Sequence, residues 1–271
     1  MIPVAFDYQR ASSVEEAIAA LSGGDGKILA GGHSLIPAMK LRLNQASRLI
    51  DITRIQSLKG IKEEDGEIVI GAGTTHADIA NDTLIKNKLP FFAEAASMIG
   101  DVQVRNHGTI GGSLAHADPA ADWPALVLAA DAVIKVKGAG GARRIKATDF
   151  FTGFFSTALE EGEIITSIRI PVPAEGTKTT YQKFSQPASR FAIVGCAVMR
   201  SGAKINIAFT GVSDTPFRDT AAETVLAGNN VDGACSAAAE GVTIMGDHFA
   251  SEEYRKHLAK VYLKKALHAV L

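Results

Sequence analysis

Residues 30–34 read Ala-Gly-Gly-His-Ser, and residues 109–113 read Thr-Ile-Gly-Gly-Ser. We expect each pair of glycines to lie where a strand turns into a helix. Glycine has no Cβ and adopts positive φ freely, so backbone N–H groups and a helix N-terminus can approach a diphosphate closely. Together the two stretches predict a cradle for one dinucleotide cofactor.

The sequences that flank both glycine pairs make this interpretation more specific. Residues 30–43 read AGGHSLIPAMKLRL, and residues 103–124 read QVRNHGTIGGSLAHADPAADWP. Both stretches resemble the FAD motifs of the medium subunits of the carbon monoxide dehydrogenase and xanthine dehydrogenase family, the molybdenum hydroxylases. The resemblance covers nearly the whole chain, and the long motifs occur in the expected order.

Local patterns predict a mixed α+β chain. Ser13 and Glu16 have the spacing of a capping box, Ser34 can cap a second helix, and Asp65-Gly66 is a hairpin signal. Further helices are predicted over 91–99, 122–130, 221–227, 233–243 and 252–271, and strands over 27–30, 48–52, 59–62, 67–70, 132–136, 163–170, 180–185, 191–200 and 204–211. Two prolines at 171 and 173 mark a domain boundary, because closely spaced prolines interrupt both a helix and the hydrogen bonds between strands.

The resemblance implies a more detailed domain organisation. It predicts an FAD-binding domain of the PCMH type over residues 1–173, with subdomains at about 1–56 and 57–173. A smaller α+β domain, an antiparallel sheet with helices, is expected over residues 174–271. The sequence pattern alone supports only a mixed α+β fold with a boundary near Pro173.

The resemblance also implies which residues contact FAD, bound without a covalent bond. The first loop is expected beside the diphosphate with N–H donors from Gly32, His33 and Ser34, and the second loop is expected to close the other side. Asp122 matches an acidic position that contacts the adenosine half, and Lys183 is expected near the flavin edge. The predicted cofactor-binding residues are Ile28, Leu29, Ala30, Gly31, Gly32, His33, Ser34, Leu35, Thr74, Ile99, Gly108, Thr109, Ile110, Gly111, Gly112, Ser113, Asp118, Asp122, Ile165 and Lys183.

Several of these residues have a purely structural alternative. Asp118 and Thr74 could each cap a helix, and Lys183 could be a solvated strand residue. Ile99 stands where some relatives place an aromatic ring against the flavin. His107 and His116 are nine residues apart without a third ligand, a spacing that does not favour a metal site.

Composition limits the function classes. The chain has 271 residues, 46% of them hydrophobic, as in a globular protein. Its net charge of −1 gives no excess of positive charge that would attract nucleic acid. No apolar run is long enough for a membrane span, and no signal peptide is visible, so we expect a cytoplasmic protein. Cys196 and Cys235 are the only cysteines, too few for an iron–sulfur cluster, and are predicted to be packing residues.

No catalytic acid, base or nucleophile pattern is apparent, so the redox chemistry is expected to come from FAD and from partner chains. The resemblance implies a large molybdenum subunit and a small iron–sulfur subunit carrying [2Fe–2S] clusters, assembled as a dimer of heterotrimers. Electrons would pass through FAD to a quinone, NAD or another acceptor. The alternatives are a stand-alone flavin oxidoreductase, the flavin subunit of a xanthine, nicotine or aldehyde dehydrogenase, and a structural protein that has lost the flavin.

Overall fold

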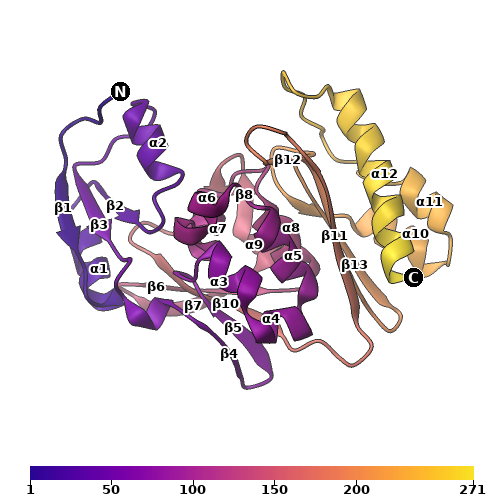
Figure 1. Cartoon of the computed structure of the whole chain (residues 1–271), viewed down its shortest axis with the longest axis horizontal. Helices are drawn as coiled ribbons and strands as arrows, with labels where there is room; N and C mark the ends of the chain where they lie inside the picture. The colour runs from indigo at the N-terminus through magenta and orange to yellow at the C-terminus, as the bar shows by residue number, and fades with distance from the viewer.

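A small parallel sheet forms the N-terminal unit of the computed structural model, which describes all residues 1–271 (Figure 1). The strand order is β1-β3-β2, and Ile18 of the flanking helix packs on Ile50 of the central strand. The elements are β1 (Asp7–Arg10), α1 (Val14–Leu21), β2 (Gly26–Leu29), α2 (Leu35–Lys40) and β3 (Arg48–Asp51).

The caps of the first two helices differ from the sequence prediction. The Ser13 hydroxyl accepts the N–H of Glu16 at 3.1 Å, but the Glu16 carboxylate accepts the N–H of Ser12 instead of Ser13, so the box is not reciprocal. Ser34 precedes α2 with a helical backbone and forms no capping bond. Its hydroxyl therefore stays available to a ligand.

A five-stranded antiparallel sheet is the centre of the molecule. Its strand order is β4-β5-β10-β6-β7. The strands are β4 (Ile61–Glu64), β5 (Glu67–Gly71), β6 (Val133–Gly138), β7 (Gly141–Lys146) and β10 (Ile164–Pro171). The Asp65-Gly66 turn joins β4 to β5 as predicted, and residues 138–141 join β6 to β7.

Helices gather on one face of this sheet (Figure 1). Ile68, Ile134 and Ile168 of the sheet share one core with Phe92 and Trp123 of the helices. The segments of this unit are η1 (Gln56–Leu58), α3 (His76–Asn81), α4 (Thr83–Lys88), α5 (Pro90–Met98), α6 (Val102–His107), α7 (Ile110–His116), α8 (Asp122–Ala129), α9 (Ala147–Phe150), β8 (Phe151–Gly153) and β9 (Ser156–Thr157).

The C-terminal unit is an antiparallel sheet between two helical layers, as Figure 1 shows. One face carries Tyr181 and Ala208 into the central core under α5 and α8, and the other packs Cys196 and Phe209 on Leu263. The elements are β11 (Lys178–Ser185), β12 (Ala192–Ser201), β13 (Lys204–Thr210), β14 (Phe217–Arg218), α10 (Thr220–Ala227), α11 (Val231–Ser236) and α12 (Glu252–Val270). Cys196 and Cys235 both lie in this core, which confirms the packing role predicted for them.

Two sequence predictions are wrong in their local structure. The second glycine pair follows the helix α6, not a strand, and lies inside α7, because Thr109 begins a new helix directly after Gly108. The helix predicted over 233–243 ends at Ser236. There the Asp219 carboxylate accepts the N–H of Ala239, whose φ is +58°, and so holds the chain out of the helix.

The predicted domain boundary near Pro173 stays a prediction.

No helix of the chain has both the length and the apolar surface needed to cross a bilayer.

Candidate functional site

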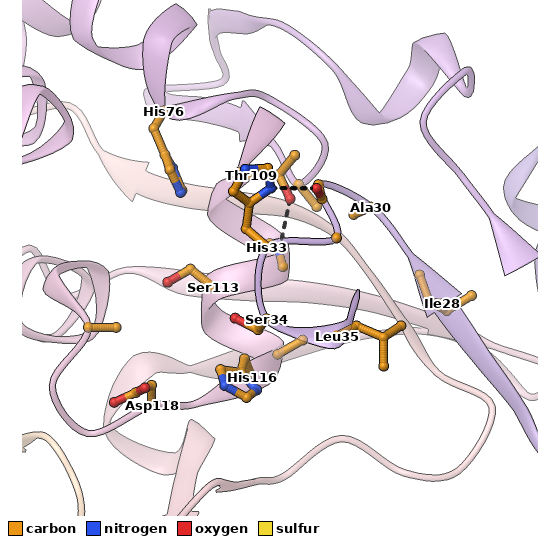
Figure 2. A pocket seen from close by; sticks show the side chains of 18 of the residues that line it. Ile28, Ala30, His33, Ser34, Leu35, His76, Thr109, Ser113, His116 and Asp118 are labelled. Carbon is orange, nitrogen blue, oxygen red and sulfur yellow. Dashed lines mark hydrogen bonds between the residues drawn. The ribbon is translucent and has the colours of Figure 1, made fainter. Parts of the chain in front are cut away.

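A cavity of about 480 Å³ lies where the N-terminal, central and C-terminal units meet. The loop after β2 and the segment from Gly108 to Ser113 form two of its walls (Figure 2). Gly31 brings the two walls together, since a Cβ on Gly31 would overlap the carbonyl of His107. The volume is within the range of small-molecule and cofactor sites.

The first loop offers the free hydrogen-bond donors of this cavity. The backbone N–H groups of Gly32, His33 and Ser34 donate to no protein acceptor. Gly32 has φ +72°, a conformation that favours glycine, and it turns the chain from β2 toward α2. His33 is held by a 2.7 Å contact between its Nδ1 and the carbonyl of Gly31. Successive N–H groups of this kind can bind an anionic oxygen.

The second loop differs from the first because its own fold uses its donors. The N–H groups of Ile110, Gly111 and Gly112 donate to the carbonyls of Thr74 and Ala72 and to the hydroxyl of Thr109. A Cβ on Gly111 would lie 2.6 Å from that of Ala72, so this glycine allows close packing within the protein. The second glycine pair therefore shapes the wall and contributes no free N–H group, and the contact of this loop with a diphosphate stays a prediction.

Apolar side chains form a third part of the wall. Ile99 and Ile165 line the cavity at positions predicted from the sequence. Phe191 lines it as well, although 43% of its surface is exposed. It belongs to the loop between β11 and β12, where the Arg190 guanidinium donates to the carbonyl of Gly100 at 3.2 Å. No local pattern in the sequence points to this third segment.

Two carboxylates lie at the beginning of α8. Asp118 accepts the N–H of Ala120 at 2.9 Å and lines the cavity, and burial raises its pKa. It is not the N-cap of α8, which is Ala121. Asp122 also lines the cavity and accepts hydrogen bonds from the Tyr181 hydroxyl and, at 2.8 Å, from Lys183 Nζ.

Lys183 is a buried ion-pair partner, and its predicted approach to the flavin edge stays a prediction. Its side chain is fully buried, and its ammonium is paired with Asp122 behind the cavity wall. It is therefore neither a solvated strand residue nor part of the lining. Through this pair, β11 of the C-terminal sheet fixes the orientation of an acidic group in the cavity.

His76 is a lining residue that the sequence analysis missed. Its Nδ1 accepts the indole N–H of Trp123 at 3.1 Å, so the ring proton lies on Nε2. Burial lowers the pKa of His76 to about 4, which keeps the imidazole neutral. A Cβ on Gly108 would lie 2.7 Å from Nε2, so the glycine makes room for this ring at the edge of the cavity (Figure 2).

Sixteen of the twenty predicted residues line the cavity, and Leu29, Thr74, Ile110 and Lys183 do not. Thr74 is buried, and its hydroxyl bonds both the N–H and the carbonyl of Gly60. The helix cap suggested for it belongs to Thr75, which forms a reciprocal box with Asp78. Which of the twenty residues contact a cofactor stays a prediction.

Known proteins resemble this chain over its full length. Residues 4–173 match the family described as FAD binding domain in molybdopterin dehydrogenase, and residues 179–270 match the CO dehydrogenase flavoprotein C-terminal domain. The carbon monoxide dehydrogenase medium chain of Hydrogenophaga pseudoflava is 42% identical, with 99% of this chain and 98% of that protein covered.

Two further comparisons agree with this match. The glyceraldehyde dehydrogenase medium chain of Sulfolobus acidocaldarius is 38% identical, and all of both chains is covered. A solved structure of carbon monoxide dehydrogenase from Hydrogenophaga pseudoflava, lacking the Mo-pyranopterin moiety of its cofactor, superposes with a TM-score of 0.96 at 42% identity, covering 100% of this chain and 98% of that one.

Proposed function

Because this chain belongs to the family of FAD-binding subunits of the molybdopterin dehydrogenases, with the C-terminal domain of the CO dehydrogenase flavoproteins, we propose that it is the FAD-carrying electron-transfer subunit of a molybdenum hydroxylase. The observation that carries this proposal is the cavity itself. Residues 32–34, whose backbone N–H groups have no acceptor in the protein, line this cavity together with the segment between α6 and α7. Gly31 holds the two segments so close that no Cβ would fit between them.

The residues present fit FAD by the chemistry of their donors. The free N–H groups of residues 32–34 and the uncommitted hydroxyl of Ser34 suit the diphosphate, and Asp122 suits the hydroxyls or amine of the adenosine half. Ile99 and Ile165 provide apolar surface for the ring system. When bound, FAD would supply exchange between one-electron and two-electron steps.

The side chains of this protein would hold and orient the cofactor and perform no proton transfer. His33 forms its only hydrogen bond with the Gly31 carbonyl, and we propose that it stays unmodified, so that FAD is held without a covalent bond. His76 is fixed as a neutral donor by Trp123. We assign no catalytic side chain to this subunit.

We propose that partner chains complete the enzyme. The relatives are named medium chains, so a large and a small chain accompany them. We assign the molybdenum cofactor to the large chain and the [2Fe–2S] clusters to the small chain, in a cytoplasmic dimer of heterotrimers. Within this chain we propose residues 1–173 as the FAD-binding domain, with subdomains at about 1–56 and 57–173, and residues 174–271 as the C-terminal domain.

Carbon monoxide and an aldehyde are both candidate substrates of the complex. The relatives at 42% and 38% identity act on carbon monoxide and glyceraldehyde respectively, according to their names. The cavity described above binds the flavin in either case, so the substrate is selected in the molybdenum subunit. We rank carbon monoxide first, because that relative has the higher identity.

Purification of the tagged chain from its native host tests the proposal. We expect FAD, iron and molybdenum to elute together with a larger and a smaller chain, and carbon monoxide or an aldehyde to bleach the flavin absorbance of this complex. A chain that elutes alone with FAD and oxidises a substrate without metal would favour the stand-alone oxidoreductase instead.

A further inference from the structure

A second cavity, of about 350 Å³, lies on the polar face of the five-stranded sheet. Side chains alternate along β10, so that Ile168 and Ile170 enter the core under the helices while Ser167 and Arg169 line this cavity. The FAD-binding residues proposed above lie elsewhere, since no residue lines both cavities. The cavity has no role in the function proposed so far.

One wall of this cavity is a fixed backbone segment, residues 57–60. The Leu58 carbonyl accepts the N–H of Gly73 at 2.7 Å, and the Gly60 carbonyl accepts that of Gly71 at 2.9 Å. A Cβ on Gly71 would overlap the Leu58 carbonyl, so glycine lets the segment cross close above the sheet. The hollow is therefore held open by hydrogen bonds and does not depend on a mobile loop.

The lining is positively charged. Four basic side chains line the cavity, Lys59, Lys62, Lys135 and Arg169, against the single carboxylate of Glu64. Glu64 is already occupied, since it pairs with Lys62 at 2.8 Å and with Arg169 at 3.2 Å. Arg169 has a further partner in Glu67. Lys59 and Lys135 form no ion pair, so two ammonium groups remain without a counter-charge.

Ser167 adds a hydrogen-bond donor that nothing in the protein uses. The residue is only 8% exposed, and its hydroxyl forms no hydrogen bond. The hydroxyl oxygen itself is open to the cavity, so it can donate to a ligand or to ordered water there. It lies opposite Lys135 in the β10–β6 register, so the two side chains leave the sheet from neighbouring positions that both line the cavity.

We propose that this cavity binds a phosphate group, either as the free ion or as the ester of a small metabolite. Lys59 and Lys135 would neutralise the two charges of the phosphate, and Ser167 would donate to one of its oxygens. A compact dianion with several acceptor oxygens can use donors from separate segments around one cavity, which a single carboxylate cannot do equally well. This site is independent of FAD binding.

Calorimetric titration of the full-length, FAD-saturated chain tests the proposal, with inorganic phosphate and ribose 5-phosphate as probes in a phosphate-free buffer. Lys135→Met is expected to weaken binding about tenfold, and Ser167→Ala several-fold. Lys86→Met is the matched control, because it removes the same charge from the exposed surface of α4, on the opposite side of the sheet. Circular dichroism establishes that each variant is folded.

Tighter binding of ribose 5-phosphate would identify a phosphorylated metabolite as the ligand, and equal or weaker binding would identify the free ion. Two results would overturn the proposal. One is the absence of binding at millimolar concentrations of both probes. The other is binding that Lys135→Met and Ser167→Ala leave unchanged, which would place the anion elsewhere on the chain.

Discussion

Trp123 donates its indole N–H to Nδ1 of His76 across 3.1 Å, inside the core that supports the cofactor cavity. The two residues come from α8 and α3, which both contact the second glycine segment: the N–H of His76 donates to the Gly108 carbonyl, and α8 packs on α7. The bond fixes the tautomer and the ring orientation of a histidine that lines the cavity. The buried Trp123 thus determines that His76 carries its ring proton on Nε2 at the cavity wall.

The first prediction is a pH dependence that originates at His76. Burial lowers its pKa to about 4 from an ordinary value of 6.5, so the unfolded chain binds a proton that the folded chain does not. The stability that depends on neutral His76 is complete above about pH 6.5 and is lost as the pH falls toward 4, about 3 kcal/mol in all. Urea unfolding between pH 4.5 and 7.5 measures it.

His76→Asn should flatten this slope, whereas His268→Asn on the exposed face of α12 should leave it intact. An unchanged slope in the His76 variant would mean that other groups produce the acid sensitivity.

The second prediction concerns the buried pair of Asp122 and Lys183. Lys183→Met leaves the Asp122 carboxylate buried without its cation, which should destabilise the protein by about 3 kcal/mol and weaken FAD binding. Lys264→Met, which breaks an exposed pair with Asp232, should cost less than about 1 kcal/mol. Unfolding curves and FAD titrations compare the two, and equal costs would contradict the positioning role of Lys183.

The third prediction concerns the contact between the two loops. Gly31→Ala places a methyl group on the His107 carbonyl and should push the loops apart, with about 1–3 kcal/mol of destabilisation and a large loss of FAD affinity. Gly140→Ala is the control, since a Cβ there meets nothing within 4 Å. Full FAD binding by the Gly31 variant would show that the loops need not touch.

The fourth prediction separates two serines that precede helices. The hydroxyl of Ser34 forms no hydrogen bond within the protein, so Ser34→Ala should weaken FAD binding about tenfold without changing stability. Ser13 caps α1, so Ser13→Ala should cost about 1 kcal/mol of stability without changing FAD affinity. FAD titration and thermal unfolding of both variants test this, and the reverse pattern would place the diphosphate away from Ser34.

Local patterns predicted much of this fold. The apolar spacing from residue 252 onward gave the helix α12, and Asp65-Gly66 gave the β4–β5 hairpin, because both signals lie within a few residues. The beginning of α7 was harder to predict, since Thr109 caps a new helix only two residues after the end of α6. The glycine pair at residues 111 and 112 is compatible both with a turn from a strand into a helix and with the two successive helices observed.

The candidate site was only partly predictable from the sequence. The glycine pairs located two of its walls, and the family resemblance named Asp122 and Lys183. That Lys183 is the buried counter-ion of Asp122 depends on the packing of the C-terminal sheet against α8, across 61 positions of sequence. Phe191 and His76 have no distinguishing neighbours in the chain. Only the fold brings these side chains to the cavity.

The measurement that tests the central claim most directly is the flavin content of the purified chain after FAD loading and desalting, followed by acid precipitation. We predict one FAD per chain, released into the acid supernatant, and a strongly reduced content in the Gly31→Ala variant. A protein that retains no flavin, or that keeps it equally well with the loops separated, would contradict FAD binding between these two loops.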